Sequence, residues 1–87
     1  MSVKEKIAAG AKIVDVRTPE EFKGGAFPGA VNIPVQEIMA RMAEIPKDKP
    51  VVVYCLSGAR SSSAARALKQ AGYADIVNAG GLSDMPR

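Results

Sequence analysis

The one cysteine of the sequence, Cys55, stands between an apolar run and a segment that can form a helix. Val-Val-Val-Tyr precedes the thiol, and Leu-Ser-Gly-Ala-Arg follows it. A free cysteine is commonly a buried structural side chain, which is the simpler interpretation. However, a glycine, an arginine and a helix start directly after the thiol are features that favour a reactive thiolate. We therefore predict that Cys55 is a nucleophile.

The residues after Cys55 predict how a thiolate would be stabilised. Gly58 supplies the backbone freedom for a sharp turn, and a helix is expected over residues 61–72. Backbone N–H groups of the turn and of the helix start would converge on an anion, and Arg60 would add positive potential. Because the chain contains no histidine, the thiol has to be activated by a lowered pKa and not by a Cys-His pair.

The elements that must position these residues can be read from the apolar pattern. Four runs rich in valine and isoleucine predict β-strands over residues 12–16, 30–33, 51–55 and 75–79. Thr18 to Glu21 forms a capping box with proline at the first helical position, and Gly24 ends the short helix that it opens. Further helices are predicted over residues 3–9, 35–45 and 61–72.

This alternation of strands and helices predicts a three-layer α/β/α fold with a mostly parallel central sheet, formed by residues 1–87 as a single domain. In such sheets, ligands bind beyond the carboxyl ends of the strands. Asp15 and Arg17 follow the first strand and Cys55 ends the third, so all three should lie at one edge. For Asp15 and Arg17 we favour a structural role, through hydrogen bonds or an ion pair that could include Glu21.

Composition excludes several classes of protein. One cysteine permits no intrachain disulfide, and without histidine we expect neither a metal nor a cofactor. A net charge of +3, with scattered basic residues and few aromatic ones, favours small anionic ligands over nucleic acid. Lys12 and Asp15 interrupt the N-terminal apolar segment, which is therefore neither a signal peptide nor a membrane span. We expect a cytoplasmic monomer, or a periplasmic one if a signal peptide was removed.

Several motifs resemble, in the right order, those of rhodanese domains. Residues 55–61, Cys-Leu-Ser-Gly-Ala-Arg-Ser, resemble the family's active-site loop: a cysteine, four variable residues, then arginine and serine. Residues 13–22 resemble the first motif of the family, residues 27–34 the second, and residues 72–73 and 77–82 the closing segments. The resemblance covers nearly the whole chain and is closest to compact single-domain thiosulfate sulfurtransferases, including the phage-shock type. Ala26 and Met85 depart from the histidine and tryptophan that are common at these places.

The resemblance implies that Cys55 takes a sulfane sulfur from a small anionic donor such as thiosulfate and holds it as a persulfide. The acceptor would be cyanide, a thiol or reduced thioredoxin. The residues that would bind the donor and the persulfide are Leu56, Ser57, Gly58, Ala59, Arg60 and Ser61, with Asp15 and Arg17 in support. Two alternatives stay open: a cysteine phosphatase or arsenate reductase of related architecture, and a sulfur carrier or regulatory module that does not turn over.

Other residues have simpler predicted roles. Serines at a helix start are usually caps, which is the role expected for Ser61, although its hydroxyl could also bind sulfur. Met39 and Met42 belong to the apolar stripe of their predicted helix and should lie in the core. Gly80 and Gly81 should form a turn that lets the chain pass close to the site.

Overall fold

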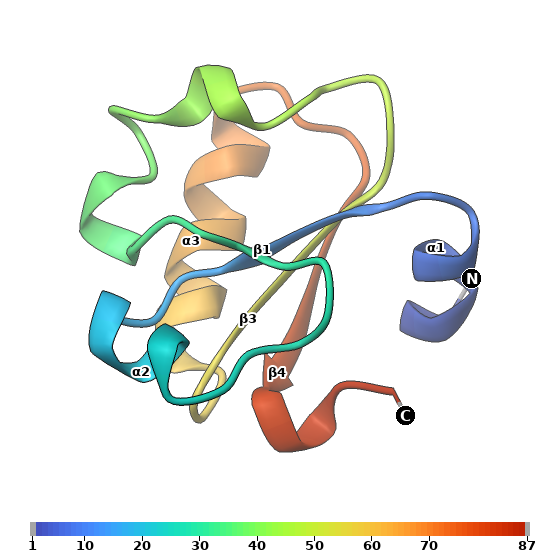
Figure 1. Cartoon of the computed structure of the whole chain (residues 1–87). Helices are drawn as coiled ribbons and strands as arrows, with labels where there is room; N and C mark the ends of the chain where they lie inside the picture. The colour runs from blue at the N-terminus through green and yellow to red at the C-terminus, as the bar shows by residue number, and fades with distance from the viewer. Residues whose placement is uncertain (1, 87) are drawn as a thin grey trace.

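The computed structural model describes residues 2–86, which form a parallel four-stranded sheet with helices on both faces (Figure 1). The strands are β1 (Lys12–Asp15), β2 (Val31–Asn32), β3 (Val51–Cys55) and β4 (Ile76–Gly81), in the order β2-β1-β3-β4. The helices are α1 (Val3–Ala8), α2 (Pro19–Lys23) and α3 (Ala59–Gln70). The predicted α/β fold with a parallel central sheet is confirmed.

The central strand β3 carries the site because its side chains alternate between two buried faces. Val51, Val53 and Cys55 face the core that α3 covers, together with Leu68. Val52 and Tyr54 face the other core, which α1 and the last residues of the structure cover. All five residues of β3 are fully buried. A strand that is apolar on both faces is typical of a parallel sheet enclosed by helices.

The predicted helix over residues 35–45 is wrong. The segment contains two short 3₁₀ helices, Val35–Glu37 and Met42–Glu44, joined by turns. The backbone hydrogen bonds of these two short helices join residues three apart, and the Tyr73 hydroxyl lies 3.1 Å from the Met42 carbonyl and 2.6 Å from the Ile45 carbonyl. Ile38 and Ile45 still reach the core, so the apolar spacing identified buried positions but not a continuous helix.

The structure also corrects the prediction that Met39 lies in the core, and it moves the boundaries of two predicted strands. Met39 is 60% exposed and not in the core, whereas Met42 is partly buried against it. Met39 turns outward because Ile38, its neighbour in the irregular segment, takes the buried direction. The strand predicted at residues 30–33 is shorter, and the one predicted at residues 75–79 extends to Gly81.

The short helices begin at capping boxes. Ser2 caps α1 together with Glu5, and Thr18 caps α2 together with Glu21, as the sequence predicts for the second helix. Pro19 occupies the first position of α2, where its missing N–H is not needed. Within residues 2–86 there is no helix with the length and apolar character that crossing a membrane requires.

The core contact between α3 and β3 gives a first prediction. Leu68 is fully buried, so Leu68→Ala should lower the free energy of unfolding by about 2–5 kcal/mol, through lost apolar contact and the cavity left behind. Lys69→Ala, at the exposed next position of the same helix, is the matched control and should change stability by less than about 0.5 kcal/mol. Urea unfolding measures both. Equal effects in the two variants would contradict the packing described here.

Candidate active site

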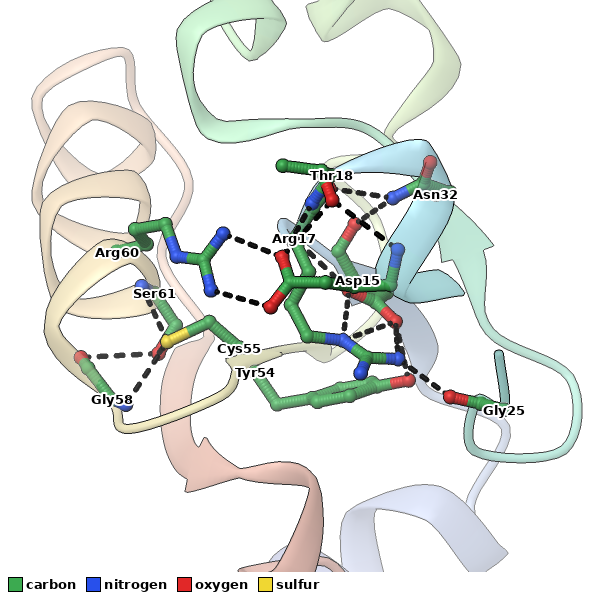
Figure 2. A network of polar contacts seen from close by, with 11 residues as sticks. Asp15, Arg17, Thr18, Gly25, Asn32, Tyr54, Cys55, Gly58, Arg60 and Ser61 are labelled. Atoms are coloured by element: carbon green, nitrogen blue, oxygen red, sulfur yellow. Dashed lines mark hydrogen bonds and ion pairs between the residues drawn. The ribbon is translucent and has the colours of Figure 1, made fainter. Parts of the chain in front are cut away.

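Cys55 ends β3 on the face that α3 covers, and its side chain is fully buried. Backbone N–H groups of Gly58 and Ser61 donate to Cys55 Sγ, at 2.9 Å and 3.4 Å. The Ser61 hydroxyl lies 3.3 Å from the same sulfur (Figure 2). Burial agrees with the simpler interpretation of the cysteine, but a purely structural thiol does not need three polar neighbours. We call residues 55–61 the cysteine loop.

The surroundings of Cys55 favour the thiolate. Burial raises the pKa of the thiol, because the charged form loses water. Hydrogen bonds from the Ser61 hydroxyl and from the amides of Ser61, Gly58 and Ser57 outweigh this effect, and the net pKa is lowered. The prediction that the thiol is activated by local polar groups is therefore supported by this geometry. These groups belong to the turn and to the first residues of α3, where amides are free of helical partners.

Glycines allow the cysteine loop to close. Gly58 has a φ of 97°, in the left-handed region, and is the N-cap of α3. The register between β3 and β4 shifts by one residue between Val53 and Cys55, a bulge that brings Gly81 beside the sulfur-bearing residue. A Cβ on Gly81 would lie 2.1 Å from the Leu56 carbonyl oxygen. The predicted close approach of residues 80–81 to the site is confirmed.

Arg60 is paired, which changes its expected role. Its guanidinium donates to both carboxylate oxygens of Glu21, at 2.8 Å and 3.2 Å. Arg60, together with the Thr18 backbone, lowers the pKa of Glu21 to about 2, so the pair stays ionised at neutral pH. Because Glu21 balances the arginine, the positive potential that Arg60 offers the sulfur is smaller than the sequence suggested. The pair joins α2 to the cysteine loop.

Asp15 and Arg17 form a buried ion pair on the other face of the sheet from Cys55. Arg17 Nη2 lies 2.7 Å from Asp15 Oδ2, and the Tyr54 hydroxyl donates to the same oxygen at 2.8 Å (Figure 2). Arg17 also donates to the Gly25 carbonyl at 2.8 Å. The predicted ion pair is confirmed, but Glu21 belongs to Arg60 and not to this pair. Through Tyr54, the pair holds the residue that precedes the cysteine.

The start of α3 differs from the prediction, and one site residue was missed. α3 begins at Ala59, so Ser61 lies inside the first turn and is not its cap. Its hydroxyl instead donates to Asn78 Oδ1 of β4, at 2.6 Å. Asn78 was not predicted, because no local pattern shows which residue of β4 faces the loop. Leu56, Ser57 and Ala59 are exposed at its outer side.

The buried polar side chains of the described residues are paired within the protein. Among residues 2–86, no three His, Cys, Asp or Glu side chains converge as metal ligands. Every buried side-chain nitrogen and oxygen in this range has a hydrogen-bond partner. Of the polar groups of the site, two loop amides and the Ser61 hydroxyl contact the sulfur of Cys55.

The fold is a parallel α/β sheet, and a cysteine stands at the end of strand β3, where amides of the following turn donate to its sulfur. These two features define a class of α/β domains whose active-site loop begins with a cysteine. The chain belongs to the rhodanese-like domain family, whose model matches residues 2–85. A relative named "Sulfurtransferase", from Allochromatium vinosum, is 50% identical over 66 residues, which cover 76% of this chain and 62% of that protein. The chain thus spans about three fifths of that relative's length.

Two further comparisons agree with this assignment. "Thiosulfate sulfurtransferase PspE" of Escherichia coli is 42% identical over 83% of this chain and 71% of that protein. A solved structure described as "rhodanese with anions from E. coli" superposes with a TM-score of 0.76 at 38% identity. That superposition covers 88% of this chain and 95% of the other. The family resemblance drawn from the motifs is confirmed.

The close contact between Gly81 and the cysteine loop gives a second prediction. Gly81→Ala would push its methyl group into the Leu56 carbonyl, displacing the turn that presents amides to Cys55. We expect stability to fall by about 1–3 kcal/mol, as in other overpacked sites, and the pH midpoint of Cys55 alkylation to rise. Urea unfolding and the pH dependence of iodoacetamide alkylation measure the two effects.

Gly24→Ala is the matched control for Gly81→Ala. Gly24 has a φ of −76° and its added Cβ would meet backbone atoms only at 3.5 Å and 3.7 Å. This variant should retain both the stability and the alkylation profile of the parent protein. An unchanged profile in Gly81→Ala would show that β4 does not constrain the cysteine loop.

Proposed function

We propose that this chain is a sulfurtransferase that carries sulfane sulfur on Cys55, with thiosulfate as a donor. The observation that carries the proposal is the sulfur of Cys55 bound by two loop amides and a serine hydroxyl. Family membership and the names of the two relatives support it. A lowered thiol pKa is the property that a sulfur nucleophile requires.

In the first step, the Cys55 thiolate attacks the outer sulfur of thiosulfate. A bond forms between the two sulfur atoms, the sulfur–sulfur bond of thiosulfate breaks, and sulfite leaves with the electron pair. The enzyme then holds a persulfide whose terminal sulfur is anionic. Because Cys55 is fully buried in this structure, the exposed outer residues of the loop must move to admit the donor. Gly58 provides a flexible point for that movement.

In the second step, an acceptor nucleophile attacks the terminal sulfur of the persulfide. Cyanide becomes thiocyanate, and the electron pair of the broken bond returns to Cys55 as thiolate. A thiol or reduced thioredoxin would take the sulfur in the cell. The amides that bind the thiolate are suited to the persulfide anion as well, so the same groups serve both states.

The size of the cysteine loop favours sulfur over phosphorus chemistry. Four residues separate Cys55 from Arg60. A phosphate ester needs several amides around its oxygens while phosphorus is held in line with the thiolate. Here two loop amides donate to Sγ itself, the shorter contact at 2.9 Å, an arrangement that suits a terminal sulfur atom on the cysteine better than the several oxygens of a phosphate. We therefore expect negligible hydrolysis of aryl phosphates.

Replacement of the cysteine tests the proposal. Cys55→Ser should abolish thiosulfate:cyanide transfer, because a hydroxyl cannot form a persulfide and no second cysteine exists to replace it. Ser62→Ala, an exposed position on α3, is the control and should keep full activity. Thiocyanate formation is the measurement, with circular dichroism to confirm folding.

Three outcomes, from the transfer assay and from parallel tests of sulfur loading and phosphate hydrolysis, would overturn or change the proposal. Substantial transfer by Cys55→Ser would contradict the role of the cysteine. Loading with sulfur but no sustained turnover in the parent protein would identify a carrier instead of an enzyme. Efficient hydrolysis of an aryl phosphate through Cys55, without sulfur transfer, would replace the proposal with the phosphatase alternative.

A further inference from the structure

The hydroxyl of Ser61 lies among more acceptors than it has hydrogens. Its neighbours are Asn78 Oδ1 at 2.6 Å, Gly58 O at 3.2 Å, Cys55 Sγ at 3.3 Å and Gly80 O at 3.4 Å. A serine hydroxyl has one hydrogen to donate. The shortest of these contacts is to Asn78, so the hydrogen points there. In that arrangement, Ser61 can only accept from Cys55, and the sulfur receives no hydrogen from the serine hydroxyl.

The orientation of the Asn78 side chain is fixed by two other hydrogen bonds. The Gly80 amide donates to Asn78 Oδ1 at 2.9 Å, and Asn78 Nδ2 donates to the Gly58 carbonyl at 3.2 Å. The reversed carboxamide would place its NH₂ group against the Gly80 N–H and its oxygen against the Gly58 carbonyl. The acceptor oxygen therefore stays directed at Ser61.

We infer that Asn78 is a positioning residue that competes with Cys55 for the Ser61 hydrogen and thereby weakens the support that Ser61 gives to the thiolate. When the thiol ionises, its proton passes to water and the Ser61 hydrogen turns from Asn78 Oδ1 to Sγ. The Gly58 and Ser61 amides keep their bonds to sulfur in both states. The inference rests on the proposed function only for its role in catalysis. The ionisation of the Cys55 thiol itself can be measured without any sulfur transfer.

Arg66 and Lys69 of α3 line a surface cavity together with Asn78, and both are the same in every variant compared. Other charged and titratable groups near this edge of the sheet are paired with each other or with a backbone amide. These are Arg60 with Glu21, Arg17 with Asp15, the Tyr54 hydroxyl with Asp15, and Asp84 with the Gly81 amide. Within residues 2–86, none of these paired groups forms a hydrogen bond with the Ser61 hydroxyl or with the Asn78 side chain. A difference between variants at Ser61 and Asn78 therefore reports on that contact.

The pH dependence of Cys55 alkylation in single and double variants tests the inference. Asn78→Ala should move the midpoint to lower pH and speed alkylation below the midpoint about two- to tenfold, the effect of one hydrogen bond freed for the thiolate. Ser61→Ala should move the midpoint to higher pH. In the Ser61→Ala background, Asn78→Ala should have no further effect on the midpoint, because the shared hydrogen is absent.

Two controls separate competition for the hydrogen from loosening of the loop. A loosened loop would change the rate at high pH, where all the thiol is ionised, whereas competition shifts the midpoint. Asn78→Asp keeps an acceptor towards Ser61 and adds negative charge, so its midpoint should lie at or above that of the parent. Ser62→Ala should match the parent.

The inference would be overturned by a midpoint that rises in Asn78→Ala, or by an equal shift with and without Ser61. If Asn78→Ala does not fold, a midpoint below that of the parent in Asn78→Asp would overturn it equally. A failure to form persulfide would leave these alkylation results unaffected, so the inference and the proposed function can fail separately.

Discussion

The site depends on a requirement for hydrogen bonds at the buried end of β3. Its last residue, Cys55, is completely enclosed, so a thiolate there can be stabilised only by protein donors. The chain supplies them by turning at Gly58 directly into α3, whose first amides have no helical partners. That turn fits only because Gly81 has no side chain beside Leu56. The amide contacts to Cys55 thus depend on glycine at both position 58 and position 81.

Two ion pairs hold the surroundings of this turn. Arg60 and Glu21 connect the start of α3 to α2, and Asp15 and Arg17 anchor the neighbouring strand on the other face of the sheet. The buried Asp15–Arg17 pair also takes part in hydrogen bonds with the Tyr54 hydroxyl and the Gly25 carbonyl, which offset the burial of two charges. Neither pair donates a hydrogen bond to the sulfur. They restrict the backbone whose amides donate to it, and the charge of Arg60, balanced by Glu21, acts on Cys55 only from a distance.

Much of this arrangement could be predicted from the sequence, because its signals are local. Apolar runs identified the strands, and the residues after Cys55 identified the cysteine loop. The segment at residues 35–45 was mispredicted because apolar spacing shows which side chains are buried, and here two short 3₁₀ helices bury the same side chains without forming one α-helix. The pairing of Arg60 with Glu21, 39 residues away, and the approach of Asn78 depend on the tertiary fold and have no local signal.

The central claim is that the buried sulfur of Cys55 accepts a sulfur atom and holds it as a persulfide until an acceptor removes it. Mass spectrometry of the intact protein after incubation with thiosulfate tests this claim most directly. We predict a gain equal to the mass of one sulfur atom, lost again when cyanide is added, because the loop amides stabilise the persulfide anion. A protein whose mass stays unchanged in excess thiosulfate, while its thiol is still free to react with iodoacetamide, would contradict the account.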